Sequence, residues 1–252
     1  MLTAYETQVQ RLLQNPGAPT SLYSVSDIDS YINTARGQLA GEAECIRYLG
    51  TISTVVGQTS YNFSDISTGV SATNGIQGVI NIRQMLFGLG DGKKWVPSRA
   101  WEWFLQYHLN NAVPVQGSPA AWSQFMQGAA PGSTGSVAGG TFYIDPPPDA
   151  VYTLYLDCVC YPIALADNTT VEAIPFLWTD AVPFFAAYYA LLSSQTSARI
   201  ADAERMMNHY TKFVERARQA SNPDVLRHQY SQAGDPAQAN KLQIRGGTPG
   251  VG

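Results

Sequence analysis

Apolar residues recur with helical spacing near both ends of the chain, whereas between the ends they alternate in short runs. In the first stretch they lie three or four positions apart, which predicts a helix that stops at Asn15-Pro16-Gly17. A longer stripe follows Ser24 and Ser26, either of which can cap a helix. This stripe predicts a second helix over about residues 26–49 that ends at Gly50. The two stripes consist of Leu2, Tyr5, Val9, Leu12 and Leu13, then Ile28, Ile32, Ala35, Leu39, Ile46 and Leu49.

The middle of the chain, from Thr51 to about Pro162, changes to β-branched and aromatic runs separated by Gly, Asn and Ser. This pattern is typical of short strands joined by turns. Gly88 to Gly92 predicts a hairpin turn, and Gly57-Gln58 predicts another. We expect strands at 51–56, 61–63, 79–82, 85–87, 94–96, 119–125, 141–144 and 151–161, the last of them being the longest. One short helix is expected around Trp101, Phe104, Leu105 and His108.

The helical pattern returns at about Ile174. Asp180 can cap a helix in which Pro183 is the third residue, where a missing N–H costs nothing. Residues 182–192 are apolar on nearly every face and predict a central helix. A heptad-like stripe predicts the next helix, and Asn222-Pro223 predicts a short last helix through Tyr230. The stripe consists of Ile200, Ala203, Met207, Tyr210, Val214 and Ala217.

These elements predict an α+β fold. We expect an antiparallel helical bundle of four longer helices plus a short C-terminal one, with a β-rich insertion between the second and third helices. Residues 1–50 and 163–232 would form the bundle, and residues 51–162 the insertion. Residues 233–252 have few apolar groups and predict an extended C-terminal arm.

The charge content points to contact with other proteins. Charged residues make up 13% of the chain, against roughly 25% in an average soluble protein. Charge depletion with many aromatic residues is typical of buried interfaces. A monomer with a surface of low charge is the alternative interpretation. The net charge of −4 argues against a general nucleic-acid binder.

The sequence favours a protein that is made in a cytoplasm. Three cysteines, Cys45, Cys158 and Cys160, cannot all pair, which fits a reducing compartment. The first residues show no signal-peptide pattern. The longest apolar run, Val182 to Leu192, is too short to cross a bilayer.

Candidate chemistry is sparse, and we expect no catalytic residue, metal or cofactor. The histidines His108, His209 and His228 lack partners at metal-ligand spacing, and Cys158 and Cys160 are too few for a structural zinc site. The segment from Gly88 to Trp95 resembles a phosphate loop but lacks its first glycine and its Ser or Thr. Carboxylates that could form a glycosidase pair are Asp145, Asp149, Asp157, Glu172 and Asp180, but no spacing brings two together.

One block of residues resembles the head-to-tail connector adaptors of tailed phages, especially the short-tailed kind. The resemblance spans about residues 20–220 and depends on the order of the elements and on a proline-aspartate turn. It is carried by Tyr31-Ile-Asn-Thr-Ala-Arg36, Gly50-Thr51, Tyr143-Ile-Asp-Pro-Pro-Pro-Asp149, Tyr152-Thr-Leu-Tyr-Leu156, Cys160-Tyr-Pro162, Leu165, Ile174-Pro175 and the run from Trp178 to Gln195.

The resemblance implies a structural protein of the virion that forms a ring, typically a dodecamer, beneath the portal at the head–tail junction. The bundle would lie near the portal and the β-rich part near the tail or nozzle protein. DNA would pass through the channel without sequence-specific binding, and no membrane would be involved. The arm would bind the portal through Lys241, Leu242, Ile244 and Arg245, and tail-facing loops would include Lys93, Lys94 and Trp95.

Two other functions stay open. A tail-tube or nozzle component would use the β-rich part, rather than the helices, for its main ring contact. A cell-wall hydrolase carried in the virion would need two coupled carboxylates in a cleft.

Overall fold

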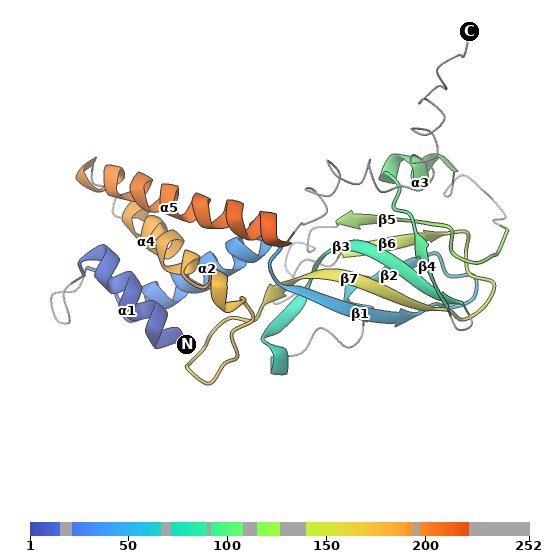
Figure 1. Cartoon of the computed structure of the whole chain (residues 1–252), viewed down its shortest axis with the longest axis horizontal. Helices are drawn as coiled ribbons and strands as arrows, with labels where there is room; N and C mark the ends of the chain where they lie inside the picture. Colours follow the sequence, from blue (N-terminus) through green and yellow to red (C-terminus); the bar gives the residue numbers. More distant parts are fainter. Residues whose placement is uncertain are drawn as a thin grey trace, which may run out of the picture.

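The computed structural model describes residues 1–15, 22–66, 72–89, 92–107, 115–126, 140–193 and 197–221, and it places helices at one end and strands at the other (Figure 1). Four helices lie together, the strands extend away from them, and one short helix, α3, lies over the strands. The helices are α1 (Leu2–Leu13), α2 (Val25–Ala43), α3 (Trp101–Tyr107), α4 (Ala181–Ser193) and α5 (Ser197–Ser221). The strands are β1 (Arg47–Ser53), β2 (Ser60–Asn62), β3 (Ile76–Leu89), β4 (Gly92–Val96), β5 (Ala121–Met126), β6 (Gly140–Asp145) and β7 (Thr153–Pro162).

Helix α4 lies at the centre of the helical part, as its apolar sequence predicts. It contacts α1, α2 and α5, and most of its side chains are buried. Pro183 is the third residue of the helix, as expected. Ser24 begins α2 with a capping box, in which its hydroxyl accepts from the Asp27 N–H and the Asp27 carboxylate accepts from the Ser24 N–H.

The predicted end of the second helix is wrong. Helix α2 ends at Ala43, because Glu44 adopts a left-handed conformation with φ 50°, and β1 begins at Arg47. Ile46 fits the helical stripe, but its carbonyl accepts a hydrogen bond from the N–H of Cys160 at 2.9 Å. Pairing with β7 therefore begins where we expected two more helical turns.

The strands form two antiparallel sheets, which we call the four-stranded sheet (β1-β7-β3-β4) and the three-stranded sheet (β2-β6-β5). The hairpin expected at Gly57-Gln58 is wrong, because β1 pairs with β7 while β2 pairs with β6 in the other sheet. The hairpin expected at Gly88 to Gly92 is confirmed by the pairing of β3 with β4. Strand β3, with 14 residues, is longer than β7, which has 10.

The fold class is α+β, but the predicted architecture is wrong. We expected four longer helices plus a short C-terminal one, with the strands as an insertion into a helical bundle. The described residues contain five helices, of which α3 lies in the β part, and strand content is 29%. Long pairings of β3 with β7 make the antiparallel sheets a main component of the fold. The short helix expected at 223–230 lies outside the described residues.

The two parts meet where α2 packs on the end of β7. Gly37 of α2 lies so close to the ring of Tyr161 that an added Cβ would be 2.3 Å from the hydroxyl oxygen. Gly41, one turn later, has no atom within 4 Å of such a Cβ. The glycine at position 37 therefore allows the close contact between helix and sheet.

Candidate interaction surfaces

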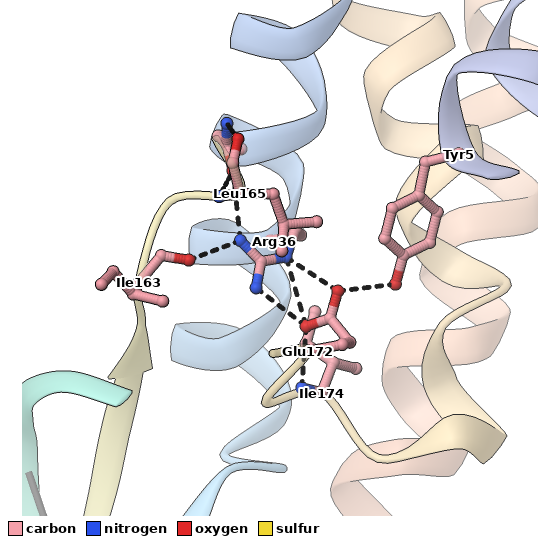
Figure 2. A network of polar contacts seen from close by, with 7 residues as sticks. Tyr5, Arg36, Ile163, Leu165, Glu172 and Ile174 are labelled. Carbon is pink, nitrogen blue, oxygen red and sulfur yellow. Dashed lines mark hydrogen bonds and ion pairs between the residues drawn. The ribbon is translucent and has the colours of Figure 1, made fainter. Parts of the chain in front are cut away.

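A buried ion pair fixes the segment that returns from the sheets to the helices (Figure 2). The side chains of Arg36 and Glu172 are 1% and 8% exposed, and their charged groups meet through hydrogen bonds of 2.8 to 3.2 Å. Arg36 also donates to the carbonyl of Ile163 at 2.7 Å. Glu172 accepts from the hydroxyl of Tyr5 at 3.1 Å and from the N–H of Ile174 at 2.9 Å. One ion pair therefore connects α1, α2 and residues 163–174.

The remaining partners complete this network. Asn33 accepts from Arg36 at 3.1 Å and from the N–H of Leu165 at 2.8 Å. Burial, and then the negative charge of Glu172, raise the pKa of Tyr5 well above its usual value. Tyr5 is therefore a neutral hydrogen-bond donor to the carboxylate. By sequence Glu172 is a candidate glycosidase carboxylate, whereas the structure places it in this network.

The residues that we expected to face the tail lie on β4, an edge strand at the end of the sheet away from the helices (Figure 1). Lys93, Lys94 and Trp95 are all exposed, and Trp95 is 59% exposed. The ammonium group of Lys93 lies 3.8 Å from the centre of the Tyr155 ring, a favourable cation–π distance. That of Lys94 lies 5.9 Å from the centre of the Phe87 ring.

The strand register brings Trp95 into a row with other side chains. Trp95 pairs with Leu86, Leu86 pairs with Tyr155, and Tyr155 pairs with Thr51 on β1. Residues that are opposite each other in antiparallel strands point to the same face of the sheet. We call Leu86, Lys93, Trp95 and Tyr155 the β4 patch. The other face of these strands carries the core, which includes Met85, Phe87, Leu154 and Leu156.

A largely apolar groove of about 590 Å³ lies on the helical part. Phe184 of α4 forms its centre and stacks on His209 and Phe213 of α5, at ring-centre distances of 5.2 and 5.9 Å. The lining residues are Gln8, Arg11, Leu12, Asp180, Pro183, Phe184, His209 and Phe213. The sequence does not predict that His209 lines a groove.

A second, more polar cavity of about 640 Å³ is lined by residues of β3, β5 and the segment that leads into α3, together with Glu44. Arg83 lines it, lies 3.5 Å from Glu44 and donates to the carbonyl of Ser221 at 3.0 Å. Arg47 donates to the same carbonyl at 2.9 Å. Two arginines therefore hold the end of α5 on the sheet.

Two large apolar side chains project at the turn before α4. Phe176 is 82% exposed and Leu177 is 74% exposed. The sequence pattern predicts that the helical region begins in this stretch, and it does not distinguish these two residues from their neighbours. They lie in a 3₁₀ turn, Phe176–Trp178, which is too short for a periodic pattern from which their exposure could be predicted.

The histidines and cysteines of the described residues take part in no metal-binding group. No group of three His, Cys, Asp or Glu side chains in this part of the chain could hold a metal ion. His108 and His228 lie outside it. Burial raises the pKa of Cys158 to about 12 and those of Cys45 and Cys160 to about 11, so these thiols are neutral at pH 7.

Glu6 on α1 and Asp29 on α2 form a close carboxylate contact that sequence analysis did not consider. Burial raises the pKa of Glu6, and its hydrogen bond to Asp29 and the charge of Asp29 raise it further. Neither residue lines the apolar groove or the polar cavity described above. The pair therefore lies between two helices and outside both of these sites.

This pair should give a stability that depends on pH. The pKa of Glu6 is raised in the folded protein. The contribution of Glu6 to the free energy of unfolding therefore falls as pH rises above the usual pKa of glutamate. We expect Glu6→Gln to raise the free energy of unfolding at pH 7 by roughly 0.5 kcal/mol. At pH 4 the variant and the unmodified protein should differ little. Urea unfolding at both pH values checks this, with the exposed Glu204→Gln as control, and an equal gain at both values would contradict it.

The predicted portal-binding residues Lys241, Leu242, Ile244 and Arg245 lie outside the described residues. So does the rest of the expected arm, 233–252. Among the helices that the structure does describe, none combines the length and apolarity needed to cross a membrane.

The described residues thus define a protein whose surfaces are suited to contact with other proteins, through exposed aromatic side chains and an apolar groove. The chain belongs to the SU10 adaptor protein family, whose model matches residues 3–238. This confirms the resemblance to phage head-to-tail adaptors. Membership of this family makes the chain a structural adaptor protein of a bacteriophage virion, which associates with other virion proteins. No curated protein matches the chain.

Proposed function

We propose that this chain is a head-to-tail connector adaptor that forms a ring under the portal, surrounds a DNA channel and provides the platform for the tail. The observation that carries the proposal is the family match over residues 3–238, which is nearly the whole chain. The role needs surfaces for a neighbouring copy, for the portal and for the tail. The structure has exposed apolar surfaces on both of its parts.

The helical part is proposed to lie near the portal and the β part near the tail. The two parts occupy opposite ends of the long molecule, so one subunit can contact different partners at each end (Figure 1). The apolar groove between α1, α4 and α5 supports helix contacts between neighbouring copies. A contact between two different faces of each copy closes into a ring with cyclic symmetry.

Residues 233–252 are proposed to bind the portal, with Lys241, Leu242, Ile244 and Arg245 as contacts. A segment with few apolar groups can cover a large surface when it orders on a partner. This property suits ordered assembly, because the arm would bind only when a portal ring is present.

The channel is proposed to let DNA pass without holding it, and the chain is proposed to have no enzymatic activity. Its net charge of −4 disfavours tight binding of a polyanion. Two of the candidate glycosidase carboxylates form ion pairs, Asp157 with Arg47 and Glu172 with Arg36.

The test is the native mass of the purified chain, alone and after mixing with the portal ring of the same phage. We expect a stoichiometric complex with the portal that forms with full-length chain and is lost when residues 233–252 are deleted. Circular dichroism of the truncated chain checks that the described part still folds. If the full-length chain does not bind the portal ring at micromolar concentration, the connector proposal is wrong.

A tail-tube or nozzle component is the second candidate function, and the β4 patch on the four-stranded sheet favours it. In that case the main contact between copies would involve β4 and Trp95. Crosslinking of the assembled ring distinguishes the two, because crosslinks between copies would join β strands rather than helices.

A further inference from the structure

The β4 patch combines exposed apolar side chains with unpaired positive charge. Trp95 is 59% exposed, and Leu86 and Tyr155 are partly exposed beside it. The other face of this sheet is buried against the core, so these side chains form the outward face. An exposed aromatic side chain beside an aliphatic one is typical of the centre of a protein interface, and charged groups are typical of its rim.

Among the described residues, Lys93 of the β4 patch and the adjacent Lys94 have no acidic partner. Within the described residues, Arg36, Arg47, Arg83 and Arg205 each pair with a carboxylate, but neither Lys93 nor Lys94 does. The chain has only four lysines, namely Lys93, Lys94, Lys212 and Lys241. Two of these four therefore stand side by side on one exposed edge strand.

The arrangement of the two lysines fits recognition of carboxylates. Successive residues of a strand point to opposite faces, so Lys93 and Lys94 project on either side of β4. The ring of Tyr155 lies beneath the Lys93 ammonium group at 3.8 Å and helps to hold it in place. A partner that brings an apolar side chain onto Trp95 would meet Lys93 on the same face and could reach Lys94 only around the free edge of β4.

We propose that the β4 patch binds a tail protein of the virion through a surface that presents carboxylates around an apolar side chain. This rests on the proposed function, because the connector role makes the tail the partner at this end of the molecule. It goes further in giving the chemistry of the partner surface, which is acidic around an apolar centre.

DNA is a less suitable partner for this patch. A nucleic-acid surface normally carries an extended basic face, and this chain has a net charge of −4.

Lysines on an edge strand also protect a sheet from pairing with other strands. Such protection needs charge but not a particular sign. A change to glutamate would keep this protection and remove carboxylate recognition. The sign of the charge therefore separates the two roles.

The experiment compares Lys93→Glu/Lys94→Glu with Lys93→Arg/Lys94→Arg in full-length chain. Each protein is added to DNA-filled heads and tails from cells infected with a phage that lacks the gene for this chain. Infectious titre and the fraction of tailed particles in electron micrographs are measured at about 50 and about 300 mM salt. The portal-binding assay and thermal unfolding are run on the same proteins.

We expect the glutamate variant to reduce tail attachment at least about tenfold, and the arginine variant to retain it. Attachment by the unmodified protein should weaken at the higher salt concentration. Trp95→Ala should also reduce attachment, whereas Val25→Ala, which removes a similarly exposed apolar side chain at the other end of the molecule, should not. Portal binding and thermal unfolding should be unchanged in all variants.

Undiminished tail attachment by the glutamate variant would overturn the proposal. It would also be overturned if the glutamate variant lost affinity for duplex DNA, measured by fluorescence anisotropy, while tail attachment stayed unchanged. Failure of the proposed function looks different, because the unmodified chain would then not bind the portal ring at all.

Discussion

Replacing Arg36 with methionine should lower the free energy of unfolding by about 3–5 kcal/mol, because it leaves a buried carboxylate without its partner. Glu172 is only 8% exposed and receives its charged hydrogen bonds from Arg36. The carbonyl of Ile163 also loses its 2.7 Å hydrogen bond. Chemical denaturation followed by tryptophan fluorescence measures the loss. Four of the five tryptophans lie in the β part, and the fifth, Trp178, lies just before α4.

The control removes both charges. In the double variant Arg36→Met/Glu172→Leu no unpaired charge is buried, so a large part of the lost stability should return. Tyr5→Phe should have a smaller effect, since it removes one hydrogen bond and leaves the ion pair intact. A loss below about 1 kcal/mol for Arg36→Met would show that Glu172 escapes to solvent or is protonated in the variant.

Replacing Gly75 with alanine should cost about 3 kcal/mol, because of both its conformation and its surroundings. Gly75 has φ +70°, which side-chain-bearing residues rarely adopt. A Cβ there would lie 2.4 Å from the carbonyl oxygen of Val171, a backbone atom next to Glu172. Residues 171–173 would have to move away from β3, and with them the ion pair with Arg36.

Gly57→Ala is the matched control for this change. Gly57 has a similar φ of +77°, but a Cβ there would meet only the end of the flexible Gln116 side chain, at 3.2 Å. Its cost should be about 1 kcal/mol, due to the backbone conformation alone. Thermal and urea unfolding measure both variants. Equal losses at the two positions would contradict a role for the contact with Val171.

The sequence predicts the local elements of this fold better than it predicts their pairing. Helix α4 and the β3–β4 hairpin follow from uninterrupted apolar residues and from glycines at a turn. The end of α2 could not be predicted, because Ile46 and Leu49 fit a helical stripe as well as a strand. Ile46 is buried and Leu49 is 56% exposed, as expected for a strand with one open face.

For the candidate surfaces too, the sequence predicts local elements but not which elements lie beside them. Lys93, Lys94 and Trp95 could be placed on a hairpin from the local sequence alone. Their neighbours Leu86 and Tyr155 depend on the register between β3, β4 and β7, which no short segment determines. The groove around Phe184 likewise requires α1, α4 and α5 to be packed together.

The helical part is built from the two ends of the chain, and this affects how the protein can be made. Helices α1 and α2 leave the ribosome early, but α4, on which both pack, is more than 130 residues further along the chain. The hydrogen bonds of Thr3 with Asn168 join residues 165 positions apart. Contacts of such long sequence separation form late and slowly. A chain terminated before α4 and α5 would therefore lack the packed helices, so only chains that extend through α5 could supply a helical surface for assembly.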